Sequence, residues 1–133
     1  MAAGFLKVLE QADEHAGEVL EPRLRDMIRL RVSHLNGCAN SIRIHAESLS
    51  RDGVRPDLIS ALARPVRQAR AELIGEGEAA ALRLAEVLTD APRALEPEAR
   101  DMAGAYFNAT QLGAIVETVA MTNAWNRVMR GTD

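Results

Sequence analysis

Asn36 and Gly37 stand between two segments that both carry apolar residues at helical spacing, and this break constrains the fold most strongly. Asn-Gly is a strong turn signal. The segment before it begins at Pro22, which suits the first turn of a helix, and the segment after it runs from Cys38 to about Ser50. We therefore expect two helices joined by a tight turn, with Cys38 within one residue of the start of the second.

The rest of the chain also has the pattern of helices separated by proline and glycine breaks. The expected segments are residues 3–14, 22–35, 38–50, 56–64, 79–88, a piece beginning at 97, and a last helix capped by Asn108 or Thr110. The last helix carries an apolar stripe of Leu112, Ile115, Val116, Val119 and Ala120. Hydrophobic residues make up 47% of the chain and aromatic residues only 3%, which favours an aliphatic helical core over a sheet. The predicted fold is all-α, with six or seven helices in one domain over residues 1–133.

Charge and composition exclude several classes of function. The net charge of −3 argues against an electrostatic nucleic-acid binder. A single cysteine allows no internal disulfide, and no stretch approaches the roughly 18 apolar residues that span a bilayer. The first twenty residues lack the apolar run of a signal peptide, so a cytoplasmic protein without membrane contact is expected. No phosphate-binding loop, flavin motif or haem motif is present, so no cofactor is expected.

The lone cysteine lies in a position that favours a reactive thiol. In the first turn of a helix, Cys38 would face unpaired backbone N–H groups and the positive end of the helix dipole, which favour thiolate. Two residues seven positions apart on a helix point in directions that differ by only roughly 20°. Cys38 and His45 therefore share one face, and Ser41 lies between them. A Cys-x-x-Cys redox pair would need a second thiol at position 41, where this chain has serine.

The run from Arg23 to Cys38, continuing to His45, resembles the core motif of the AhpD-like alkylhydroperoxidases of the carboxymuconolactone decarboxylase superfamily. Residues 106–111 and 122–127 resemble the last helix of that family, so the resemblance covers roughly residues 20–130. It implies an AhpD-like helical fold and a homo-oligomer, such as a trimer or a hexamer.

The resemblance also assigns site residues by position. In the family a glutamate stands twelve residues before the first of two redox cysteines, and a histidine follows them on the same helix. By position, the glutamate falls on Asp26, the first cysteine on Cys38 and the second on Ser41. The histidine falls on His45, and a further family histidine falls on Asn40. Catalytic roles are therefore expected for Cys38, His45, Asp26 and Ser41.

The chemistry implied by the resemblance is a proton relay around a thiol that attacks peroxide. A thiolate that attacks the O–O bond becomes a sulfenic acid, which a second thiol resolves as a disulfide. Serine cannot form that disulfide, so Ser41 removes the two-cysteine cycle and leaves turnover dependent on an external thiol. Asp26 keeps the charge of the family's glutamate but is one methylene shorter.

Each candidate also has a structural interpretation. A lone cysteine such as Cys38 is usually a small buried hydrophobe, and His45 could be a core or surface histidine. Asp26 lies among arginines on its helix and could form a surface ion pair. Ser41 lacks the setting of a hydrolase nucleophile and is read as a polar packing residue. Trp125 is expected to pack at the end of the last helix, with a pocket-lining role as the minor alternative. His15 and His34 have no ligand spacing with the cysteine, so no zinc site is expected.

Three classes of function remain open. The first is a thiol-dependent antioxidant enzyme that reduces hydrogen peroxide or organic hydroperoxides through Cys38, with a small thiol as reductant. The second is a lactone decarboxylase, which works by proton transfer and needs no thiol. The third is a catalytically inactive oligomeric protein that binds small molecules.

Overall fold

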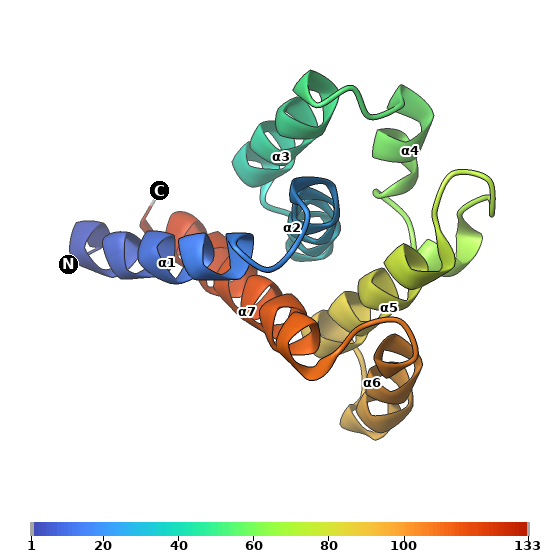
Figure 1. Ribbon diagram of the computed structural model, residues 1–133. Helices are drawn as coiled ribbons and strands as arrows, with labels where there is room; N and C mark the ends of the chain where they lie inside the picture. The colour runs from blue at the N-terminus through green and yellow to red at the C-terminus, as the bar shows by residue number, and fades with distance from the viewer. Residues whose placement is uncertain (1, 133) are drawn as a thin grey trace.

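The computed structural model describes the backbone of residues 2–132 and the side chains of residues 4–132, and every regular element in that range is helical (Figure 1). The elements are α1 (Ala2–Gly17), α2 (Pro22–Asn36), α3 (Ala39–Arg51), α4 (Pro56–Ala61), η1 (Val66–Gln68), α5 (Glu76–Asp90), η2 (Arg93–Leu95), α6 (Glu96–Gly104) and α7 (Ala109–Thr132). The prediction of an all-α fold with six or seven helices is confirmed by the seven α-helices of the described range. No helix in that range is long and apolar enough to cross a membrane.

The break between the second and third helices forms as the sequence predicts. Gly37 has φ 65° and ψ 30°, the left-handed backbone that favours glycine, and its N–H donates to the His34 carbonyl at 3.1 Å. Cys38 follows as the N-cap of α3, and its carbonyl accepts the N–H of Ile42 at 2.9 Å. The expected position of Cys38, within one residue of a helix start, is confirmed.

Local hydrogen bonds explain two helix starts: that of α5, which differs from the expected boundary, and that of α7, for which two caps were expected. Glu78 accepts the backbone N–H of Gly75 at 3.0 Å, which supports a start of α5 at Glu76 rather than Ala79. The Asn108 side chain accepts the N–H of Gln111 at 2.9 Å, and the Gln111 side chain accepts the N–H of Asn108 at the same distance. This reciprocal pair identifies Asn108, and not Thr110, as the residue that caps α7.

Helix α2 is the centre of the structure, since it contacts α3, α5 and α7 (Figure 1). Its side chains Met27, Ile28, Leu30 and Val32 are fully buried. Helix α1 lies along α7, and α6 packs on α5. The central position of α2 places its other face, which carries Asp26 and Arg29, between α1 and α3.

A buried ion pair ties α2 to α5. Arg31 donates from Nε to Glu86 at 2.7 Å, and the same carboxylate oxygen accepts the N–H of Val66 at 2.9 Å. The side chains of Arg31 and Glu86 are only 5% and 7% exposed. Because both side chains are almost completely shielded from water, each charge is stabilised mainly by the other.

The apolar stripe of α7 is divided between the core and the surface: Leu112 is partly buried against the core, and Ala120 is exposed. Ile115 and Val119 are buried, whereas Val116 is 40% exposed. Other large apolar side chains remain exposed on α1, α3 and α6, namely Phe5, Val8, Ile44 and Met102.

Candidate functional site

Cys38 and Ser41 meet at the first turn of α3. The Cys38 thiol donates a hydrogen bond to the Ser41 hydroxyl oxygen, with the sulfur and oxygen 3.2 Å apart. Both residues are buried, Cys38 with 6% of its surface exposed and Ser41 with 2%. The Asn-Gly turn ends α2, and Cys38 then caps α3, so this contact follows from the local sequence.

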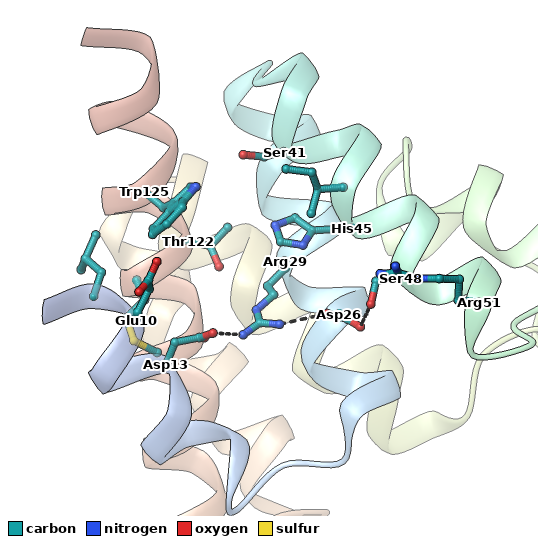
Figure 2. A pocket seen from close by; sticks show the side chains of 13 residues that line it. Glu10, Asp13, Asp26, Arg29, Ser41, His45, Ser48, Arg51, Thr122 and Trp125 are labelled. Carbon is teal, nitrogen blue, oxygen red and sulfur yellow. Dashed lines mark hydrogen bonds and ion pairs between the residues drawn. The ribbon is translucent and has the colours of Figure 1, made fainter. Parts of the chain in front are cut away.

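A cavity of about 260 Å³ lies beside this turn, between α1, α2, α3 and α7 (Figure 2). Its polar lining consists of Glu10, Asp13, Asp26, Arg29, Ser41, His45, Ser48, Arg51 and Thr122. Its apolar lining consists of Leu9, Ile44, Met121 and Trp125. This volume is close to the lower limit of about 300 Å³ for ligand pockets, so the cavity suits a small organic molecule.

The structure brings three of the four expected site residues to the cavity. Asp26, Ser41 and His45 line it, while Cys38 is not among the lining residues and contacts Ser41. Asn40 is exposed, and its side-chain oxygen accepts a hydrogen bond from Arg43 at 2.7 Å. Of the two positions that the sequence resemblance assigns to cysteines, position 41 lines the cavity and position 38 does not.

Asp26 belongs to a hydrogen-bonded chain that crosses three helices (Figure 2). One of its carboxylate oxygens accepts from the Ser48 hydroxyl at 2.8 Å, and the other accepts from Arg29 at 3.0 Å. Arg29 also donates to Asp13 of α1. Asp26 therefore forms an ion pair, as one interpretation of its sequence suggested, but Asp26 is buried, Arg29 is part-buried, and both line the cavity.

Sequence reasoning missed six polar members of the lining, and three of these six form the hydrogen-bonded chain with Asp26. Ser48 could have been found, since it lies seven residues after Ser41 and so on the same face of α3. Arg29 lies three residues after Asp26, a spacing that allows the ion pair but does not reveal the cavity. Asp13 had no sequence signal, because its contact with Arg29 depends on how α1 packs.

His45 is the titratable group of the cavity whose pKa changes most clearly. The pKa of His45 is lowered from 6.5 to about 4, first by burial and then by the positive charge of Arg29. The carboxylates of Asp26 and Asp13 oppose this change without cancelling it. At neutral pH the imidazole is uncharged, so it offers one hydrogen-bond donor and one acceptor.

Trp125 lines the cavity from α7, which was the minor alternative for this residue. Figure 2 shows its ring on the α7 side of the cavity, opposite His45 of α3. Among the described residues, no group of three or more His, Cys, Asp or Glu side chains is arranged to hold a metal ion.

Comparison with known proteins defines the class of this chain. The model of the carboxymuconolactone decarboxylase family matches residues 1–87, about two thirds of the chain, and the chain therefore belongs to that family. It is also similar to the crystal structure of ATU0492 from Agrobacterium tumefaciens, a protein of unknown function named as a candidate antioxidant defence protein, AhpD. That similarity has a TM-score of 0.80 at 27% identity and covers 98% of this chain and 86% of the other. No curated protein matches the sequence significantly.

Proposed function

We propose that this protein is an AhpD-like antioxidant enzyme in which Cys38 reduces hydrogen peroxide or an organic hydroperoxide without an internal disulfide. The observation that carries the proposal is the 3.2 Å contact between the Cys38 sulfur and the hydroxyl oxygen of Ser41, a residue of the cavity lining. The thiol is one hydrogen bond away from a cavity that also holds a carboxylate and a neutral imidazole.

The proposed reaction uses two electrons from the sulfur. The thiol loses its proton through Ser41, and the sulfur attacks one peroxide oxygen as the O–O bond breaks. The other oxygen takes up a proton and leaves as water or an alcohol, and Cys38 becomes a sulfenic acid. A small thiol then forms a mixed disulfide with Cys38 and releases water, and a second small thiol restores the cysteine and leaves as part of a disulfide.

The electrostatics of the cavity predict slow turnover. His45, with a pKa of about 4, is a weak base at neutral pH and is therefore poorly suited to accept the proton of a thiol. The peroxide must also reach a sulfur that lies behind Ser41. A reaction that depends on small thiols suits a reducing compartment, and we propose the cytoplasm.

The test is peroxide consumption with a small thiol as reductant. We expect slow turnover in the unmodified protein and none in Cys38→Ala. The matched control is Ser50→Ala, which alters an exposed serine near the end of α3 and should keep the activity. Equal rates in the unmodified protein and Cys38→Ala would overturn the proposal.

A second function is favoured by the absence of Cys38 from the cavity lining. Ser41, His45 and Asp26 do line the cavity, and a lactone decarboxylase needs only proton transfer. This activity would be lost in His45→Gln but retained in Cys38→Ala, and the second result distinguishes it from thiol chemistry. If the protein binds a small molecule but catalyses neither reaction, the result would favour the third class, a catalytically inactive binding protein.

We further propose that the protein is a homo-oligomer, as the family resemblance implies. Phe5 is 48% exposed and Val8 is 60% exposed, and both lie on α1. Large apolar side chains that remain exposed in this way are typical of a surface that another subunit covers.

A further inference from the structure

We infer that Asp13 of α1 is a positioning residue of the cavity: it holds the Arg29 guanidinium against Asp26, and so fixes the charges that surround His45. This inference deepens the proposed function, because it assigns a role within the same cavity to a helix that carries none of the family's motif residues.

Two carboxylates reach the cavity from α1, and they differ in their partners. Asp13 is part-buried and accepts a hydrogen bond from Arg29. Glu10 is exposed, and within the described residues it forms no ion pair or side-chain hydrogen bond. Asp13 therefore belongs to the hydrogen-bonded chain that includes Arg29 and Asp26, whereas Glu10 does not.

Arg29 divides its two terminal nitrogens between two helices. One nitrogen donates to Asp13 of α1, and the other donates to Asp26 of the same helix as Arg29 itself (Figure 2). The guanidinium is planar and rigid, so two partners on different sides fix its orientation. The Arg29 side chain is only 12% exposed, so water cannot replace a lost carboxylate fully.

The orientation of Asp26 follows from the same chain of contacts. Each of its carboxylate oxygens already accepts one hydrogen bond, from Arg29 at 3.0 Å and from Ser48 at 2.8 Å. These two donors hold the Asp26 carboxylate in one orientation, and the arrangement contains no hydrogen bond between Asp26 and His45. Without Asp13, one side of the guanidinium would lose its partner and Arg29 could turn away from Asp26.

The pKa of His45 is sensitive to this arrangement, because charged residues from three helices line the same cavity. Helix α1 contributes Glu10 and Asp13, α2 contributes Asp26 and Arg29, and α3 contributes Arg51. The lining residues of α7 carry no charge, and α4, which also packs on α3, contributes none to the lining. Of these charges, Arg29 lowers the pKa of His45 and both Asp26 and Asp13 raise it, while burial remains the largest cause of the low value.

The experiment is an NMR titration of the His45 imidazole in the full chain without substrate, so its outcome does not depend on catalysis. The variants are Asp13→Asn, Asp13→Glu, Arg29→Gln and the matched control Glu10→Gln. Circular dichroism at each pH confirms that the helices are intact. If peroxide turnover fails while the titration behaves as expected, only the proposed function is lost.

Loss of the Asp13 charge should shift the pKa of His45 downward, since an attractive carboxylate disappears and the charge of Arg29 is less compensated. Asp13→Glu should restore the original titration, and Glu10→Gln should leave it unchanged. Arg29→Gln should shift the pKa of His45 upward, because the positive charge that lowers it is removed. If Asp13 acts through Arg29, Asp13→Asn should shift the pKa of His45 less in the Arg29→Gln background than in the unmodified protein. The same shift in both backgrounds, an unchanged pKa in Asp13→Asn or in Arg29→Gln, or an equal downward shift in Glu10→Gln and Asp13→Asn, would overturn the inference.

Discussion

The Cys38 sulfur lies 3.2 Å from the Ser41 hydroxyl oxygen, yet of these two neighbours only Ser41 lines the cavity between α1, α2, α3 and α7. Ser41, which the sequence resemblance aligns with a second cysteine, is therefore the member of the pair that faces the cavity. The Cys38 thiol lies one hydrogen bond away from that lining residue.

Restoring a thiol at the cavity should create a redox pair. The side chains of positions 38 and 41 already face each other, so Ser41→Cys should form an internal disulfide under mild oxidation. The new thiol would also line the cavity, so peroxide consumption with a dithiol reductant should increase. Thiol counting and the peroxide assay, each on the reduced and oxidised protein, measure the two effects.

Ser48→Cys provides the matched control for that experiment. Ser48 also lies on α3 and lines the cavity, but it is ten residues after Cys38, about 15 Å along the helix. It should form no internal disulfide. An intact pair of free thiols in oxidised Ser41→Cys would contradict the observed contact between positions 38 and 41.

The low pKa of His45 predicts a specific dependence of stability on pH. The unfolded chain takes up a proton on His45 below about pH 6.5. The folded protein takes it up only near pH 4, since its His45 pKa is about 4. Stability is therefore lost as the pH falls through this window. The pKa of His34 is also lowered, by burial and by Arg31, and this acts in the same direction.

Replacing the histidine should remove its share of that dependence. Between pH 7 and pH 5, His45→Gln should lose less stability than the unmodified protein, by up to about 2 kcal/mol. Urea unfolding at the two pH values measures the difference. His15→Gln is the control, because His15 is exposed on α1. An identical loss of stability in His45→Gln and the unmodified protein would show that His45 is not kept neutral by the fold.

The buried pair of Arg31 and Glu86 should be sensitive to removal of one partner. Glu86→Gln leaves a buried guanidinium without its counter-ion and should lower the free energy of unfolding by about 3–5 kcal/mol. The double variant Arg31→Met with Glu86→Leu should recover most of this loss. Glu47→Gln, which breaks an exposed pair with Arg43, should cost less than about 1 kcal/mol. Equal effects of Glu86→Gln and Glu47→Gln in denaturant unfolding would contradict the burial of the Arg31 pair.

The apolar surface of α1 should take part in assembly. Light scattering on the full chain should give the mass of an oligomer, with a trimer or a hexamer expected from the family resemblance. Replacing Phe5 and Val8 by serine should shift the mass toward the monomer while the helical content is kept, because both side chains are exposed. A monomer mass for the unmodified protein at micromolar concentration would contradict this proposal.

The sequence predicted the helices and the position of Cys38 because those depend on local signals. Asn36-Gly37 ends one helix and places the next residue at the start of another, whatever the tertiary structure. The face shared by Ser41, His45 and Ser48 follows from helical periodicity in the same way.

The side of α3 that borders the cavity could not be read from periodicity. Positions 38 and 41 differ by about 60° around a helix, and only the packing of α1 and α7 decides which of them faces the open space. The contacts of Arg29 with Asp13 and of Arg31 with Glu86 join residues 16 and 55 positions apart. Such pairs join different helices and depend on tertiary packing. The spacing of residues in a single sequence does not predict them.

The most direct test of the account is whether peroxide oxidises Cys38 to a sulfenic acid. The reduced protein is treated with hydrogen peroxide in the presence of dimedone, which traps sulfenic acids, and is analysed by mass spectrometry. We expect one adduct per chain, located on Cys38 and absent from Cys38→Ala. Complete absence of the adduct from the unmodified protein, with the thiol still free after peroxide treatment, would contradict thiol chemistry at this site.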